Sequence, residues 1–140
     1  MGLKEVDLQK KENQMPKFGK RSQERLKGVN VKLVNVLNKL IKIMDVTIIE
    51  GVRSEKRQAE LLKKGATKVK YSKHMEGKAV DLAPYPVDWE DRERQTLFAG
   101  FVLGLARNMG IRLRWGGDWD MDFQVMDNRF DDFPHFEVRD

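Results

Sequence analysis

The chain has 140 residues, of which 40% are hydrophobic and 35% are charged, and it contains no cysteine. This length and apolar content fit one compact domain, and the absence of cysteine excludes disulfides, thiolate metal sites and a cysteine nucleophile. No apolar run approaches the roughly 20 residues that span a bilayer, and the first residues lack the apolar region of a signal peptide, so we expect no integral membrane segment and synthesis inside a cell.

The net charge of +5 is unevenly distributed along the chain. Residues 1–73 carry 19 Lys and Arg against 8 Asp and Glu, whereas residues 74–140 carry 8 against 14. A basic front half favours an anionic partner, which could be nucleic acid, a membrane surface or the anionic polymers of a cell envelope. A solvated lysine-rich surface would give the same pattern, so composition leaves these readings open.

The first predicted element is a helix that follows an N-terminal arm. Residues 1–16 are rich in Lys, Glu and Gln, and we interpret them as a flexible basic arm ahead of a domain at 17–140. From Ser22, a candidate N-cap, apolar positions recur every three or four residues as far as Met44. This spacing predicts one long amphipathic helix that contributes to the core.

The rest of the chain alternates between short strands and helices. Strands are expected at 46–50, 79–83, 111–115 and 136–138. Helices are expected at 54–65 and 88–109, with Ser54 and Asp88 as N-caps; the first ends at Gly65, and Gly110 follows the second. The intervening stretches, 68–78 and 116–134, are predicted to be loops. There are too few βαβ units for a doubly wound sheet, so the pattern favours a small single α+β domain.

The two histidines of the chain, His74 and His135, both lie near aspartates. Asp81 interrupts the apolar run of the predicted strand at 79–83, and burying a carboxylate unpaired is costly unless a cation compensates. Two imidazoles and one carboxylate are the ligand set of a catalytic zinc site, which keeps one position open for water. A salt-bridged core aspartate and two surface histidines would produce the same sequence pattern.

The motif around His74 resembles that of a known family. Residues 72–81, SKHMEGKAVD, match the pattern S-x-H-x-x-G-x-A-x-D of the zinc peptidases that include D-alanyl-D-alanine carboxypeptidases and dipeptidases. The chain is most similar to the phage endolysins that are L-alanyl-D-glutamate peptidases, through the segments FGK at 18–20, EGVR at 50–53, GGDW at 116–119 and DFPH at 132–135. This resemblance covers about residues 17–138, and it implies an antiparallel sheet with flanking helices, as in hedgehog-like D,D-peptidases.

The resemblance implies roles for several residues. His74, Asp81 and His135 correspond to zinc ligands, and Asp132, three positions before the last histidine, corresponds to the general base. Arg53 matches a family arginine that could stabilise the oxyanion or anchor a substrate carboxylate, although a surface arginine opening a helix is the alternative.

Three other positions near the site have open roles. Ser72 could orient the substrate or cap the loop. Asp131 and Glu137 compete with Asp132 for the role of base, but we interpret Glu137 as a residue that orients a ligand histidine through its other ring nitrogen.

Two further signals carry less weight. Asp118, Asp120 and Asp122 alternate like the start of an EF-hand loop, but Phe123 and Arg129 stand where glycine and glutamate are required, which leaves only a weak calcium site as an alternative. The three tryptophans, Trp89, Trp115 and Trp119, could stack on sugars of a glycan strand, but we favour a place in the core.

The function predicted from the sequence is that of a zinc-dependent endolysin that hydrolyses the L-alanyl-D-glutamate bond of peptidoglycan during host lysis. A D-alanyl-D-alanine carboxypeptidase or dipeptidase has the same signature, and a non-catalytic zinc-containing cell-wall module or a nucleic-acid-binding module is the alternative from another class. We expect a monomer that binds peptidoglycan and no nucleic acid, and that stays in the host cytoplasm until a separate membrane-permeabilising protein releases it to the cell wall.

Overall fold

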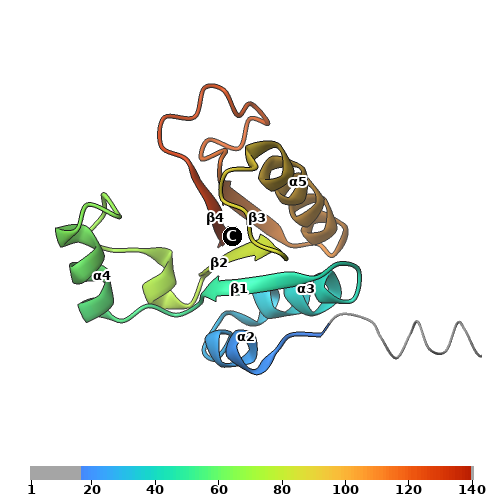
Figure 1. Cartoon of the computed structure of the whole chain (residues 1–140), viewed down its shortest axis with the longest axis horizontal. Coiled ribbons are helices and arrows are strands. Elements are labelled where there is room, and N and C mark those ends of the chain that lie inside the picture. The colour runs from blue at the N-terminus through green and yellow to red at the C-terminus, as the bar shows by residue number, and fades with distance from the viewer. Residues whose placement is uncertain (1–16, 140) are drawn as a thin grey trace, which may run out of the picture.

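The computed structural model describes residues 17–139. The helices are α2 (Lys20–Arg25), α3 (Val31–Ile41), α4 (Glu55–Lys63) and α5 (Arg92–Asn108), together with the short 3₁₀ helix η1 (Lys73–Glu76). The strands are β1 (Val46–Glu50), β2 (Ala79–Pro84), β3 (Arg112–Gly116) and β4 (Asp132–Arg139). Figure 1 shows α5 and α3 beside the sheet, with α4 projecting away from it at the left.

The four strands form one antiparallel sheet in the order β1-β2-β4-β3. The predicted α+β class, with an antiparallel sheet and flanking helices, is therefore confirmed. In this order, the central strands β2 and β4 place Asp81 directly opposite His135. Two candidate ligands that are 54 positions apart in the sequence thus become neighbours through strand pairing alone.

The alternation of side chains along the strands separates the core from the site. Val80 and Leu82 of β2 and Phe136 and Val138 of β4 belong to the same buried cluster as the apolar residues of α3 and α5. Because successive side chains of a strand point to opposite faces, Asp81 lies on the other face of the sheet. One face therefore forms the core, and the face turned away from these two helices is free to carry polar groups.

The predicted helix from Ser22 to Met44 is wrong, because the structure divides this stretch into α2 and α3. Gly28 has φ of 79°, a left-handed conformation that ends a helix, and Asn30 then caps α3 by accepting a hydrogen bond from the backbone N–H of Lys32. Ser22 is no N-cap: it lies within α2, and its Oγ accepts a hydrogen bond from Ile48 N at 3.2 Å.

Other predicted boundaries also shift. Asp91, three residues later than expected, caps α5 by accepting from Arg94 N. The last strand begins at Asp132, so the segment DFPH belongs to β4 rather than to a loop. The predicted loop at 68–78 contains η1, which carries His74.

The predicted N-terminal arm at 1–16 lies outside the described residues. Its charge can be counted from the sequence, where three lysines balance three acidic residues, so the description of this segment as basic was wrong. The positive charge of the front half belongs to residues 17–73. None of the helices within residues 17–139 combines the length and the apolar character that a membrane crossing requires.

Candidate active site

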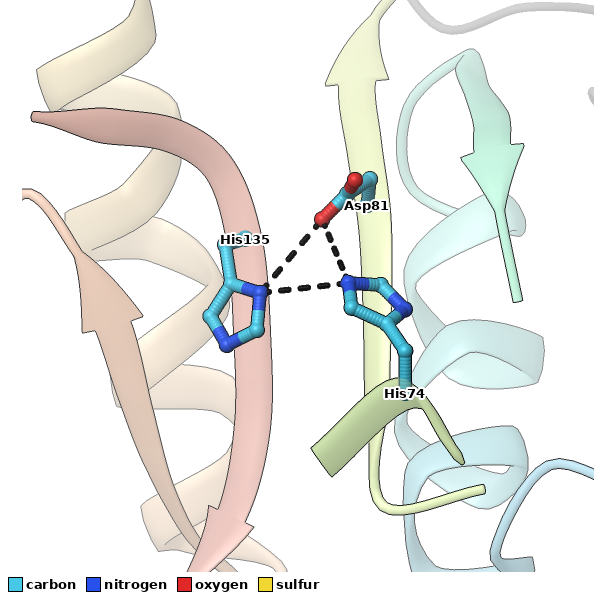
Figure 2. A group of neighbouring side chains, drawn as sticks. All are labelled: His74, Asp81 and His135. Carbon is cyan, nitrogen blue, oxygen red and sulfur yellow. Dashed lines mark hydrogen bonds and ion pairs between the residues drawn. The ribbon is translucent and has the colours of Figure 1, made fainter. Parts of the chain in front are cut away.

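Three side chains from separate elements converge on the open face of the sheet (Figure 2). Nε2 of His74 lies 3.0 Å from Oδ1 of Asp81 and 3.2 Å from Nδ1 of His135, and this Nδ1 lies 3.5 Å from the same Asp81 oxygen. Both histidines are buried. The structure therefore brings together the three candidate ligands and aims one donor atom of each at a common point, as a metal-binding group does.

Local backbone features hold His74 in place. Ser72 caps η1, and its Oγ accepts a hydrogen bond from His74 N at 3.2 Å. The helix ends at Gly77, whose φ is 72° and where a Cβ atom would lie 2.5 Å from the carbonyl oxygen of Gly28. Only glycine fits both the conformation and the close approach. This explains the glycine of the motif, which turns the chain from η1 into β2.

A second layer of hydrogen bonds fixes which nitrogen of each ring faces the site. Nδ1 of His74 donates to the carbonyl oxygen of Gly51 at 2.9 Å, and Nε2 of His135 donates to Oε1 of Glu137 at 2.9 Å. The remaining nitrogens, Nε2 of His74 and Nδ1 of His135, face Asp81, and each offers a lone pair to a metal ion once it has lost its proton. Each imidazole is thus oriented by a hydrogen bond from its other ring nitrogen. Two neutral imidazole nitrogens and one carboxylate oxygen form a donor set that fits a zinc ion.

The electrostatics of the site are dominated by carboxylates. Burial works against the charge of Asp81, but hydrogen bonds from His135 and His74 hold the pKa of Asp81 well below its usual range. Burial likewise opposes protonation of His135, yet its hydrogen bonds with Asp81 and Glu137 raise the pKa of this ring to about 9. Hydrogen bonding to His135 and the charge of Arg114 overcome the effect of burial and lower the pKa of Glu137. The site therefore attracts positive charge.

Asp132 lies beside this group at the start of β4. Its Oδ2 is 3.9 Å from Nδ1 of His135, and its side chain is 36% exposed. Burial and then the negative charge of Asp81 raise the pKa of Asp132. A partly exposed carboxylate with a raised pKa next to a metal-binding group can accept and return a proton.

The two rival candidates for the base are engaged elsewhere. Oδ2 of Asp131 pairs with Arg92 at 2.9 Å and its Oδ1 accepts from Asn128 at 2.8 Å, and this side chain does not line the cleft. Glu137 has a side chain only 3% exposed, and it is held by His135, by Arg114 at 3.1 Å and by Arg139 at 3.4 Å.

Arg53 lies in the site but is bonded to protein groups. Its Nε donates to Glu50 at 2.5 Å, its Nη1 donates to Gln58 at 2.8 Å, and its Nη2 is 3.9 Å from Oδ2 of Asp81. The side chain is 9% exposed. In this position Arg53 faces the carboxylate of a candidate metal ligand, and it also lines the cleft.

A cleft of about 530 Å³ opens above these residues. One wall comes from α4 and the chain after it, with Leu61, Val69 and Tyr71, and the other wall comes from the β3–β4 connection, with Trp119 and Phe130. The sequence did not indicate the residues of the α4 wall, because nothing in their local pattern distinguishes them from ordinary surface positions.

The tryptophans divide among three environments. Trp115 is buried in the core as predicted, whereas Trp89 is 49% exposed, so the core position predicted for Trp89 was wrong. The ring of Trp119 lies 5.2 Å from that of His135, and its Nε1 donates to the carbonyl oxygen of Phe130 at 2.6 Å. Trp119 therefore belongs to the site, and the prediction of a core position for it was wrong.

The acidic loop forms a second cluster away from the cleft. Asp118, Asp120 and Asp122 have carboxylate oxygens close to one another. The carboxylate of Asp118 accepts hydrogen bonds from the backbone N–H groups of Asp122 and Phe123, at 3.3 and 2.9 Å. These bonds give Asp118 a structural role in closing the loop.

Comparison with known proteins extends beyond the motifs. The profile of the family described as phage L-alanyl-D-glutamate peptidase matches residues 15–139. The chain is 33% identical over 112 residues to the L-alanyl-D-glutamate peptidase of Escherichia phage T5, a match that covers 74% of this chain and 82% of the phage protein.

Two further relatives are bacterial. The chain is 32% identical over 112 residues to the peptidoglycan L-alanyl-D-glutamate endopeptidase CwlK of Bacillus subtilis (strain 168), covering 68% of this chain and 61% of that protein. The crystal structure of the Serratia marcescens L-Ala D-Glu endopeptidase ChiX superimposes with a TM-score of 0.73 at 31% identity, covering 91% of this chain and 92% of that one. The resemblance expected from the motifs is confirmed, and the chain belongs to the phage L-alanyl-D-glutamate peptidase family.

Proposed function

We propose that this protein is a zinc-dependent peptidoglycan endopeptidase that hydrolyses the bond between L-alanine and D-glutamate in the stem peptide. The observation that carries this proposal is the convergence of His74, Asp81 and His135 at the floor of a cleft, with Asp132 beside them. The names of the relatives support the same bond, since three of them are peptidases that act between these two residues.

The three converging residues would hold the metal. Their donor set suits zinc, and the chain has no thiolate that would compete. When bound in such a site, zinc acts as a Lewis acid that makes a water molecule nucleophilic at neutral pH and polarises a carbonyl group. The residues behind the ligands, Gly51 and Glu137, keep both rings in the orientation that binding requires.

The remaining groups have separate tasks. Asp132 accepts a proton from the attacking water and returns it to the leaving amino group of D-glutamate, which its position and raised pKa allow. Arg53 contacts Oδ2 of Asp81, the oxygen that does not face the histidines, and so holds this carboxylate in position. Trp119 covers His135 and excludes water from one side of the site.

The test is product analysis on purified peptidoglycan. Cleavage of the proposed bond creates new L-alanine carboxyl ends and D-glutamate amino ends, and we expect both from the native protein, neither after chelation, and both again when zinc is restored. Release of D-alanine instead would identify a carboxypeptidase, and intact stem peptides in the presence of bound zinc would identify a non-catalytic module.

A pair of neighbouring variants tests the role of the base. Asp132→Asn is expected to bind zinc normally and to lose about 10²- to 10⁴-fold in kcat, the usual contribution of a general base. Asp131→Asn is the matched control, because Asp131 faces Arg92 at the surface and is expected to retain activity. Equal losses in the two variants would contradict the assignment.

Two further expectations are proposals of the same kind. The positive charge of residues 17–73 would favour binding to anionic envelope polymers, which salt-dependent sedimentation with sacculi measures. Retention in the host cytoplasm until a separate protein permeabilises the membrane stays a prediction, and fractionation of infected or expressing cells tests it.

A further inference from the structure

The proposed substrate places a negative charge beside the bond to be cut. D-glutamate carries two carboxyl groups, and its bond to L-alanine uses its amino group. The peptide continues through one carboxyl group, so the other remains free next to the scissile bond. An enzyme that binds this residue in a cleft needs a cation that is not already neutralised by the protein.

Four cationic side chains line the cleft: Arg53, Lys68, Lys73 and Arg114. Three of them already pair with a carboxylate of the protein. These pairs are Arg53 with Glu50 at 2.5 Å, Lys73 with Glu76 at 3.4 Å, and Arg114 with Glu137 at 3.1 Å. The charge of each of these three cations is therefore already neutralised within the protein.

Lys68 is different. Among residues 17–139, no carboxylate lies within ion-pair distance of its ammonium group, which instead lies 4.8 Å from the centre of the Phe130 ring. Lys68 comes from the chain after α4 and Phe130 from the β3–β4 connection, so this contact spans the cleft from one wall to the other. A ring face satisfies the charge of a lysine only partly and leaves its N–H donors free.

The backbone next to Lys68 is linked to the metal-binding group through the hydrogen bonds of Gln58 and the ion pair of Arg53. Nε2 of Gln58 donates to the carbonyl oxygen of Val69 at 2.8 Å, and Oε1 of Gln58 accepts from Arg53 at 2.8 Å. Gln58 is only 1% exposed, so both bonds are shielded from water. Because Arg53 in turn faces Asp81, the backbone beside Lys68 is held at a set place relative to the site.

We propose that Lys68 is a substrate-binding residue that recognises the free carboxylate of the D-glutamate residue. This assignment rests on the proposed function, since it names the group within that substrate that the cleft selects. Lys68 leaves the face of Phe130 or bridges it to the substrate, and its ammonium donates hydrogen bonds to the carboxylate. The aromatic ring limits the positions that the long side chain can take before substrate arrives.

The experiment compares two stem peptides that differ at one group. In the first, the D-glutamate residue keeps its free carboxyl group, and in the second this group is a carboxamide. We expect the zinc-loaded full-length protein to prefer the first peptide by about tenfold in kcat/KM, expressed in KM rather than in kcat, as one charge-assisted hydrogen bond allows.

Three variants test whether Lys68 causes the preference for the peptide with the free carboxyl group. Lys68→Met keeps an unbranched side chain against Phe130 but removes the charge. We expect this variant to cleave both peptides with the kcat/KM that the wild type has for the carboxamide peptide. Lys68→Arg is expected to retain the preference. Lys70→Met is the matched control, because it removes the same charge from an exposed position of the same loop that does not line the cleft.

The outcomes separate this proposal from the proposed function. If the wild type cleaves both peptides equally well, or if Lys68→Met keeps the wild-type preference, Lys68 does not recognise the carboxylate, although the peptidase activity stands. If Lys70→Met loses as much as Lys68→Met, the effect is one of general charge and the proposal is overturned. If the wild type cleaves neither peptide, both proposals fall together.

Discussion

Replacing Glu137 by glutamine should weaken zinc binding without displacing any proposed ligand. Oε1 of Glu137 lies 2.9 Å from Nε2 of His135, and its side chain is 3% exposed. The low pKa of Glu137 keeps it charged at neutral pH, so His135 donates to a carboxylate and turns its other nitrogen toward the site. Glutamine keeps the size and one acceptor oxygen, but it removes the charge that makes the ring a stronger donor to a metal.

The size of the effect follows from this geometry. Loss of a carboxylate behind a ligand histidine weakens metal binding by about 10- to 100-fold, or about 1.4–2.7 kcal/mol. We expect Glu137→Gln near the lower end, because the amide oxygen can still accept from His135. Glu137→Ala is expected near the upper end, since it removes the acceptor and leaves Arg114 without its carboxylate.

Competition with a chromogenic chelator measures the zinc affinity, and activity measured at rising zinc concentrations shows whether kcat recovers. Recovery is expected, because Asp132 does not contact Glu137 and keeps its place beside His135. Glu24→Gln is the control, since Glu24 lies on the exposed surface of α2, where it pairs with Lys27. A zinc affinity of Glu137→Gln within about twofold of the wild type would refute the argument from ligand orientation.

Two other substitutions probe the local structure around His74. Gly51→Ala places a Cβ atom 1.8 Å from the carbonyl oxygen of Arg25, so we expect a loss of about 1–3 kcal/mol and a Tm lowered by roughly 4 °C or more, and an unchanged thermal transition would contradict this close approach. Ser72→Ala removes the acceptor for His74 N and should cost about 0.5–2 kcal/mol in urea unfolding. A raised KM with unchanged stability would instead assign Ser72 to substrate binding.

The positions of the candidate ligands could be predicted because their chemistry is scarce and their motif is dense. A chain with two histidines and one aspartate inside an apolar strand offers few ways to build a metal-binding group. The pairing of β2 with β4 then places Asp81 opposite His135, and strand alternation puts both on the face away from the core.

The break between α2 and α3 could not be read from the same pattern. Apolar positions continue at helical spacing on both sides of Gly28, so the spacing of apolar residues alone does not reveal the turn at this glycine. The walls of the cleft were missed for another reason. Lys68 acquires its proposed role through its contact with Phe130, and no local rule connects positions 62 residues apart in the chain.

The start of β4 explains how Asp132 and His135 can act in one site. These residues are three apart, and a regular strand would point them to opposite faces of the sheet. The pairing with β3 is irregular here, however: Trp115 pairs with Phe136, but the next residue, Gly116, pairs with Asp132. The extra residues on β4 bulge out of the ladder and turn Asp132 back toward the cleft.

Two contacts hold this bulge. Nε1 of Trp115 donates to the carbonyl oxygen of Phe133 at 2.6 Å, and the lack of a side chain at Gly116 lets Asp132 approach, since a Cβ there would lie 2.1 Å from the carbonyl oxygen of Asp132. Pro134 lacks an N–H group, so it suits a stretch whose ladder bonds are interrupted. Pro134, the last residue of the loop predicted at 116–134, therefore lies in the irregular stretch of β4 that turns the proposed base toward the cleft.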